Sequence, residues 1–195
     1  MTKNGGVREV ARRAVRAEIA SKAMALFVEQ GFEETTVDQI AAAVGLSSRS
    51  VFRYFLTKED MVVGDMMHIG DEIAEALAAR PSNEAPWDAL RRALDKPLEA
   101  LGEDPKPTLD RCLMFAATPS LRAAQQRKHA QWETLLVPLV VQRLGGATSS
   151  RDLRARSIVS AALSCLDVAV TEWTRCLGAQ PMDKLLDAAI AAVRG

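Results

Sequence analysis

The sequence predicts an all-α protein of about nine helices, and three observations support this fold class. Apolar residues recur at steps of three and four, as in Ile19, Ala23, Leu26 and Phe27. All eight prolines lie at Pro81 or later, so the N-terminal part of the chain can form uninterrupted helices. Alanine, a strong helix former, is abundant, whereas the two-residue alternation of a half-buried strand is hard to find.

The first two helices are delimited by a glycine and a capping pair. Gly31 follows the expected first helix, in the place where a C-terminal glycine belongs. Thr36 and Gln39 have the spacing of a capping box, in which the threonine hydroxyl accepts from the Gln39 amide and the Gln39 side chain reaches back. A second helix is therefore expected to begin directly after Thr36.

The next two helices are marked in the same way. Gly45 ends the second helix, and Ser47 or Ser48 can cap a short third one. Thr57 can cap a long fourth helix that runs toward Pro81. Because the residue before a proline is displaced from the α region, the fourth helix should end there.

Prolines punctuate the second part of the chain. Pro97 and Pro138 lie inside apolar runs and should kink or split their helices. We expect an N-terminal domain over residues 1–57 and a C-terminal domain over residues 58–195. The expected helices cover residues 7–30, 37–44, 48–55, 58–79, 84–101, 108–117, 120–144, 150–177 and 181–194.

The composition is that of a soluble globular protein, with 195 residues, 48% of them apolar and 26% charged. Lysine and arginine total 25, as do aspartate and glutamate, so the net charge is zero and gives no average support for DNA binding. The charge is nevertheless uneven. Residues 1–22 carry six basic and two acidic side chains, residues 23–46 carry four acidic and none basic, and residues 47–58 carry three basic and none acidic.

Targeting signals and reactive motifs are missing from the sequence. No apolar stretch approaches the length of a membrane span, and the basic N-terminus lacks the apolar core of a secretory signal, so we expect a cytoplasmic protein. Cys112, Cys165 and Cys176 are expected to be free thiols, and no metal-binding spacing involves them or the two histidines. No catalytic motif occurs, so we expect neither a cofactor, a metal nor an enzyme.

The most informative segment is residues 31–58, where two short helices are joined by a tight turn at Gly45. This is the pattern of a helix-turn-helix, whose second helix enters the major groove of DNA. Val51 and Phe55 share one face and can dock inward, which leaves polar side chains for the outer face. Serine, arginine and tyrosine are the types that contact phosphates and base edges.

Here the sequence resembles the TetR (TetR/AcrR) family of transcriptional regulators. The matching elements occur in order over about 30 residues: Gly31-Phe32, Thr35-Thr36, Ile40-Ala41, Val44-Gly45-Leu46-Ser47, the aromatic residues Phe52, Tyr54 and Phe55, and Lys58. The resemblance implies a homodimer that binds a palindromic operator, a double-stranded DNA site, and is released from it by a small-molecule effector. We expect a repressor.

The resemblance also implies roles for individual residues. Ser48 and Arg49 occupy positions that contact base edges, and Arg49 can pair with a guanine in a bidentate manner. Phe52 stands where many members have tyrosine, so one hydroxyl contact is lost. The implied phosphate contacts are Thr36 at a helix N-terminus, Ser47, Ser50, Arg53, Tyr54 and Lys58.

The C-terminal domain is expected to hold a largely apolar effector chamber. Asp167, which lies in an apolar run, could fix a polar group of the ligand. Arg122, Arg127 and Lys128 could meet an anionic ligand end, although a solvated charged face is the simpler interpretation. The remaining candidate lining residues are large and apolar: Trp87, Met114, Phe115, Trp132, Leu136, Leu166 and Trp173.

The last two helices are candidates for a dimer face, because small and large apolar residues follow steps of three and four along them. The alternative is that the same residues form the core of one chain. The candidates are Ile158, Ala162, Cys165, Ala169, Leu186, Ile190 and Val193. Two other functions remain open: a helical small-molecule-binding protein or enzyme whose N-terminal hairpin only packs, and a regulator switched by its thiols.

Overall fold

The computed structural model describes residues 3–99 and 105–194, which form ten helices and contain no strand. The prediction of an all-α fold is confirmed. The helices are α1 (Lys3–Gln30), α2 (Val37–Ala43), α3 (Ser48–Phe52), α4 (Lys58–Ala79), α5 (Pro86–Ala93), α6 (Asp95–Glu99), α7 (Lys106–Ala117), α8 (Leu121–Val141), α9 (Thr148–Arg175) and α10 (Met182–Arg194).

The tenth helix arises because the expected helix over 84–101 is split. Its first part ends at Ala93 and its second begins at Asp95. Pro97 explains the position of the break, since a proline ring clashes with the carbonyl of the residue four positions earlier, here Ala93. Pro138 does not split α8, which continues past it to Val141. The predicted end of this run at residue 101 lies outside the described residues.

Helix α3 is shorter than expected and ends at Phe52. The amides of Arg53 and Tyr54 donate to the carbonyls of Ser50 and Val51, three residues back, at 3.2 and 2.9 Å. These tighter bonds close the helix early, because the chain must turn within a few residues to start α4.

Two apolar cores hold the molecule together. The N-terminal core joins α1, α2, α3, the first turns of α4 and the start of α8. Its buried members are Ile19, Ala20, Ala23, Met24, Phe27, Phe32, Ile40, Ala41, Val51, Phe55, Met61, Val62, Val63, Leu121 and Ala124. The C-terminal core is built from the rest of α4, α5, α8, α9 and α10, with Trp132 and Trp173 among its largest members.

Helix α4 passes from one core to the other. Met61 and Val62 lie in the N-terminal core, whereas Ile73 and Leu77 lie in the C-terminal core. The two cores therefore meet within α4, and the domain boundary expected after residue 57 stays a prediction. A displacement of α4 in the C-terminal domain would be transmitted along a continuous helix toward α3.

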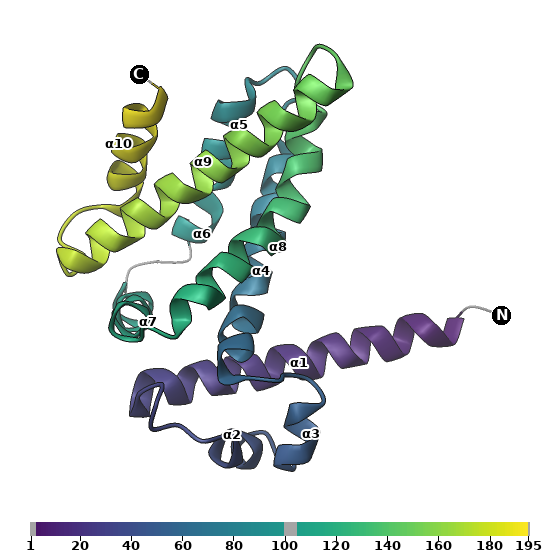
Figure 1. Cartoon of the computed structure of the whole chain (residues 1–195), viewed down its shortest axis with the longest axis vertical. Helices are drawn as coiled ribbons and strands as arrows, with labels where there is room; N and C mark the ends of the chain where they lie inside the picture. Colours follow the sequence, from purple (N-terminus) through teal and green to yellow (C-terminus); the bar gives the residue numbers. More distant parts are fainter. Residues whose placement is uncertain (1–2, 100–104, 195) are drawn as a thin grey trace.

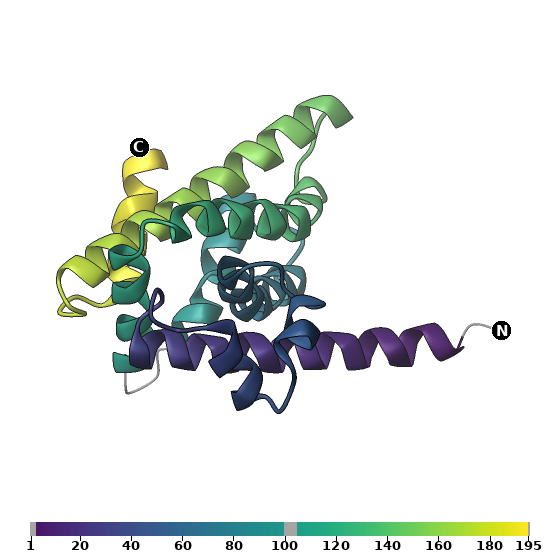
Figure 2. The same cartoon turned by 60° about the horizontal axis from the view of Figure 1, so that its bottom comes forward.

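The arrangement in space follows from these contacts. Helices α1, α2 and α3 form the lower part of the molecule, and α4 rises from them to pack along α8 (Figure 1). Helices α9 and α10 pack together on the far side of α8. The N-terminal half of α1 extends beyond α3, and no other helix lies beside it in either view (Figures 1 and 2). None of the helices of the described chain is long and apolar enough to cross a membrane.

Candidate DNA interface and its connection to the C-terminal domain

The N-terminus of α2 is fixed by the predicted capping box. The Thr36 hydroxyl accepts from the Gln39 amide at 3.2 Å, and the Thr36 amide donates to the Gln39 side-chain oxygen at 2.7 Å. Thr36 is exposed. These bonds leave the other amides of the first turn of α2 at a surface where an anion is favoured.

The turn before α3 is also built as the sequence predicts. Gly45 has a positive φ of 66°, which is readily adopted by glycine and allows the tight turn out of α2. Ser47, rather than Ser48, is the N-cap of α3, and its hydroxyl accepts from the Ser50 amide at 3.2 Å. Val51 is fully buried, so the inward face of α3 is confirmed.

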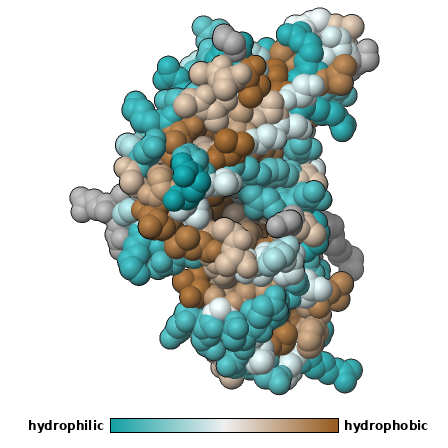
Figure 3. All heavy atoms as spheres, turned by 60° about the vertical axis from the view of Figure 1, so that its left-hand side comes forward, coloured by the Kyte–Doolittle hydropathy of each residue, from teal (hydrophilic) through white to brown (hydrophobic). Residues whose placement is uncertain are grey.

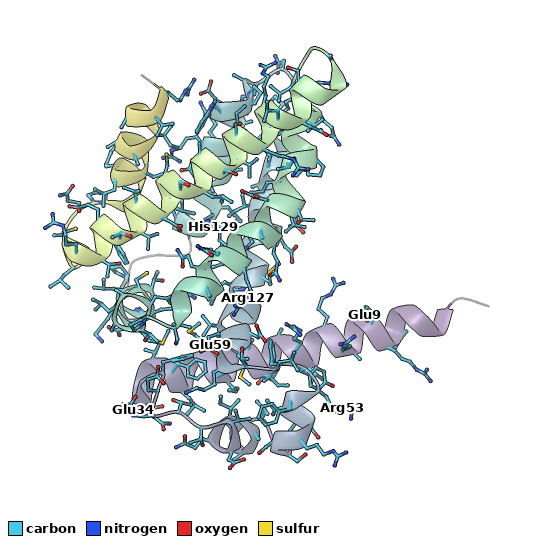
Figure 4. All side chains as sticks on the ribbon, in the orientation of Figure 1. Glu9, Glu34, Arg53, Glu59, Arg127 and His129 are labelled. Atoms are coloured by element: carbon cyan, nitrogen blue, oxygen red, sulfur yellow. The ribbon has the colours of Figure 1, made fainter. Side chains whose placement is uncertain are left out.

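The outward face of α3 carries two free cations. Arg49 and Arg53 are exposed, and neither guanidinium has an ion-pair partner in the described part of the chain. Arg53 is directed away from the body of the molecule (Figure 4). Phe52 is 47% exposed between them, so about half of its ring faces solvent on this surface.

Besides the capping residues Thr36 and Ser47, two more of the expected DNA contacts on α3 and its C-terminal end are engaged inside the protein. The Ser48 hydroxyl donates to a carboxylate oxygen of Asp38 on α2. Tyr54 is half-buried and packs against the N-terminal core. Both residues help to hold α3 in place, and Arg49 and Arg53 remain as the exposed long side chains of this helix and its C-terminal end.

Lys58, for which a phosphate contact is predicted, is engaged with backbone carbonyls in the unbound protein. Its ammonium donates to the carbonyls of Phe32 at 2.6 Å and Thr35 at 3.1 Å, with a longer bond of 3.3 Å to Glu33. It also lies 4.6 Å from the centre of the Phe32 ring. Three carbonyl oxygens and a ring face surround the cation, so Lys58 braces the α1–α2 turn, and its phosphate contact stays a prediction.

Arg16 on α1 was not predicted as a functional residue, yet it contacts the C-terminal end of α3. Its guanidinium donates to the Tyr54 carbonyl and lies 4.1 Å above the centre of the Phe55 ring. Partial burial lowers the pKa of Arg16, and the nearby Arg12 lowers it further, while Asp60 acts in the opposite direction. The basic character of residues 1–22 was the only sequence signal for this contact.

A contact between α4 and α8 links the two parts of the molecule. Arg127 on α8 lies 3.5 Å from Asp60 in the first turn of α4, only a few residues after α3. The pair borders a hollow of about 340 Å³ lined by Thr57, Glu59, Asp60, Ser120 and Arg127. Figure 4 shows Arg127 and Glu59 facing this junction from the two helices. The side chain of Arg122 lies outside the described residues.

The expected effector residues do not line one chamber. Met114 and Phe115 on α7 pack against the N-terminal core. Trp87 lies at the edge of the C-terminal core. The other apolar candidates fill the interior of that core and are buried: Trp132, Leu136, Leu166 and Trp173.

Asp167 is the exception, because it belongs to a polar cluster between α8 and α9. Lys128 is buried, contrary to the solvated face expected from its neighbours, and its ammonium lies 3.7 Å from an Asp167 oxygen and 4.7 Å from the centre of the Trp132 ring. Gln125 donates to the same Asp167 oxygen at 2.8 Å. Burial lowers the pKa of Lys128, and Asp167 opposes that shift.

Two polar atoms around this cluster lack hydrogen-bond partners. The Nε2 atom of His129 is 3.1 Å from the second oxygen of Asp167 but is not aligned for a hydrogen bond. The indole nitrogen of Trp132 is also buried and without a partner. Buried polar groups are normally satisfied, so this cluster is the part of the C-terminal interior with unused capacity for a polar ligand group.

The three cysteines give no support to a thiol switch. All three are free thiols. Burial raises the pKa of Cys112 and Cys165, which disfavours the reactive thiolate. The Cys165 and Cys176 thiols donate to carbonyls on α10 and α9 respectively.

The structure corrects most of the predicted dimer face. Helices α9 and α10 pack against each other, and five of the candidates are buried between them and the rest of the core: Ala162, Cys165, Ala169, Leu186 and Ile190. Ile158 is half-buried against the same core. Only Val193 is exposed, at 58%. The buried residues belong to the core of one chain, the alternative interpretation. An apolar stripe has the same helical period whether it packs within a chain or against a second copy.

Comparisons with known proteins agree with this geometry. The sequence model of the tetR family of bacterial regulatory proteins matches residues 19–63, and that of the MftR C-terminal domain matches residues 84–195. The chain is 32% identical to the HTH-type transcriptional regulator TcmR of Streptomyces glaucescens over 88% of this chain and 79% of that protein. It is 36% identical to the HTH-type transcriptional repressor Rv3405c of Mycobacterium tuberculosis over 44% of this chain and 43% of the repressor.

The fold is also found among solved structures. The crystal structure of Thermus thermophilus FadR, a transcriptional repressor of the same family in complex with lauroyl-CoA, has a TM-score of 0.53 and 21% identity. The match covers 90% of this chain and 91% of that one.

Proposed function

Because the chain belongs to the TetR family of DNA-binding transcriptional regulators, we propose that it is a repressor that a small-molecule effector releases from a palindromic operator. The family consists of regulators and not of enzymes. The observation that carries the proposal is the outward face of α3, where Arg49 and Arg53 are exposed without ion-pair partners among the described residues. A similar regulator, Rv3405c, is named a repressor, which supports repression rather than activation.

The effector site that fits best is the polar cluster of Lys128, Asp167 and His129. Its unused hydrogen-bonding capacity and the buried ammonium suit a largely apolar molecule with one polar or anionic end. Such an end would compete with Asp167 for Lys128. The neighbouring residue Arg127 contacts Asp60 at the start of α4, so a shift of α8 would reach the helix that follows α3.

Release then follows from a population shift. If the effector favours a position of α8 and α4 that suits the operator poorly, operator and effector must weaken each other by the same factor. In a two-fold dimer the recognition helices have to lie about 34–36 Å apart to enter successive major grooves. A small change in the direction of α4 in each protomer is enough to spoil that spacing.

Footprinting on the DNA that flanks its own gene tests the proposed function. We expect a protected palindromic site in that DNA, and we expect cell extracts that contain the effector to remove the protection. No protected site in that DNA or in a genomic library would contradict DNA binding. A protected site that no extract releases would instead contradict the effector part of the proposal.

The dimer is proposed to form through the outward faces of α9 and α10. Val168 and Val193 are exposed there, at 61% and 58%. The hydroxyls of Ser157 and Ser164 donate back to carbonyls of their own helix, so these small side chains present a flat face suited to a close helix crossing. Seen from the side of α10, apolar residues are interspersed over the upper half of the molecule (Figure 3).

Val168→Arg should therefore convert the dimer to a monomer and abolish operator binding at concentrations where the wild type is saturated. A cation placed in the centre of an apolar helix crossing is left unpaired there. Analytical ultracentrifugation measures the mass, and Leu113→Arg on α7, also exposed, is the matched control that should remain dimeric. A Val168→Arg dimer with unchanged operator affinity would place the interface elsewhere.

A further inference from the structure

We propose that the N-terminal half of α1 is a DNA-binding arm that contacts the phosphate backbone outside the operator half-site read by α3. This inference extends the proposed function to a second surface. The arm is the segment Val7–Arg16, which carries Arg8, Arg12, Arg13 and Arg16 with Glu9 as its single acidic residue. None of the predicted DNA contacts lies in it.

The direction of the arm is set by Arg16. This residue reaches the Tyr54 carbonyl and the Phe55 ring, so its face of α1 points toward the end of α3. Arg12 lies one turn earlier on the same face and is close enough to Arg16 to lower its pKa. Arg8 lies one further turn toward the N-terminus, two turns before Arg16 and its contacts with Tyr54 and Phe55.

Residues 7–14 of the arm have no ion-pair or packing partner among the described residues of the protomer. Residues 7–14 are all exposed, and Val7 and Val10 are among the most exposed large apolar residues of the described chain, at 70% and 67%. No other helix lies beside this half of α1 (Figures 1 and 2). Arg8, Arg12 and Arg13 have no ion-pair partner among the described residues.

The charge pattern works against a purely structural role. Arginines four residues apart on a helix repel each other, which costs a few tenths of a kcal/mol per pair in an isolated helix. No core or salt bridge within the described protomer offsets this cost at Arg8 and Arg12. A bound polyanion would offset the repulsion, because each arginine can neutralise a phosphate and release a condensed counterion.

The position of the arm selects DNA as that polyanion. The arm continues from the α3 surface, and its residues 7–14 add about 12 Å at 1.5 Å per helical residue. At 3.4 Å per base pair this corresponds to roughly three to four base pairs beyond the half-site. The DNA that follows each half-site of the operator is therefore within reach.

The test compares the salt dependence of operator binding between the full-length wild type and Arg8→Gln/Arg12→Gln. The probe is an operator selected on the wild-type protein from a random duplex library, made both as the core site alone and with ten extra base pairs at each end. Four lost phosphate contacts per dimer should reduce the slope of log K against log salt by about 3.6. On the long duplex, the wild type should thus lose roughly 100-fold more affinity than the variant between 50 and 200 mM salt.

Controls separate the arm from folding and from net charge. Arg92→Gln/Arg156→Gln removes the same charge from exposed side chains of α5 and α9, beside the C-terminal core, and should leave the slope unchanged. Glu9→Gln should act in the opposite direction and tighten binding to the long duplex. The flanks should improve wild-type binding, and Arg8→Gln/Arg12→Gln should lose that advantage.

Flanks that add nothing for the wild type, or an unchanged slope in the arm variant, would overturn the proposal. In either case binding to the core site would stand, so the proposed function would be unaffected. Failure of the wild type to select any duplex would contradict the proposed function itself.

Discussion

Arg49→Ala should weaken operator binding by about 10- to 100-fold and relax the choice of one base pair. The exposed guanidinium has no protein partner to lose, so the change removes a contact to DNA and nothing within the described protomer. A bidentate arginine–guanine pair contributes roughly 1–3 kcal/mol of discrimination. Fluorescence anisotropy against the operator and a set of single-base variants measures both effects, and the melting temperature should stay at the wild-type value.

Lys58→Met is the contrasting variant. It leaves the carbonyls of Phe32, Glu33 and Thr35 without their cation, so we expect the free energy of unfolding to fall by about 1.5–3 kcal/mol. The loss of DNA affinity should follow the loss of folded protein. If the Lys58→Met protein melted at the wild-type temperature but bound every duplex weakly, the result would support the phosphate contact that the family resemblance implies for Lys58. If Arg49→Ala reduced the affinity for every duplex by the same factor, Arg49 would not contribute to base recognition.

Trp132→Ala should lower the free energy of unfolding by about 3–5 kcal/mol, the largest effect expected of any single change here. The indole is 2% exposed and lies at the crossing of α4 and α8, the contact that joins the C-terminal core to the helix leading from α3. Its removal leaves a cavity in that crossing. Urea unfolding at one fixed protein concentration measures the change, since association contributes to the stability of a dimer.

Gly70→Ala tests the same crossing from the other helix. A Cβ atom at Gly70 would lie 2.5 Å from the indole Cδ1 of Trp132 and 2.6 Å from its nitrogen. Because the ring is buried and the new Cβ would overlap it, overpacking should cost about 1–3 kcal/mol in spite of the better helix propensity of alanine. Gly145→Ala is the control, because a Cβ there meets nothing within 4 Å.

The pair can also be tested together. In Gly70→Ala/Trp132→Leu the shorter side chain makes room for the alanine, so the double variant should be more stable than the sum of the single changes implies. Additive effects would indicate that the two side chains do not share one packing site.

The helix-turn-helix was predictable because its signals are local. Thr36, Gln39, Gly45 and Ser47 act on backbone groups within a few residues of themselves, and each appears in the structure with its expected role. The inward position of Val51 follows from helical period alone. The early end of α3 was missed, because the need to turn into α4 is a property of the connection rather than of the helix.

Side chains that act across elements were harder to place. Lys58 and Ser48 have roles implied by the resemblance and Arg16 has none, yet their partners in the structure are 26, 10 and 38 residues away in the chain. Lys128 was expected on a solvated face because its neighbours are charged, but it points between α8 and α9 toward Asp167. A charged residue type does not reveal which of these environments it will meet.

The sequence by itself determined the helical fold and the helix-turn-helix hairpin, since periodicity, caps and turn residues are read over one or two turns of helix, and the resemblance of residues 31–58 to known regulators indicated the family. Only the tertiary structure decided which apolar stripe is internal and which faces outward. Helix α10 of the same chain packs against α9, where Ala162, Cys165 and Ala169 are buried, whereas Val168 is exposed. Burial depends on the other helices that pack against a face, and helical period is the same whether that partner belongs to the same chain or to a second copy.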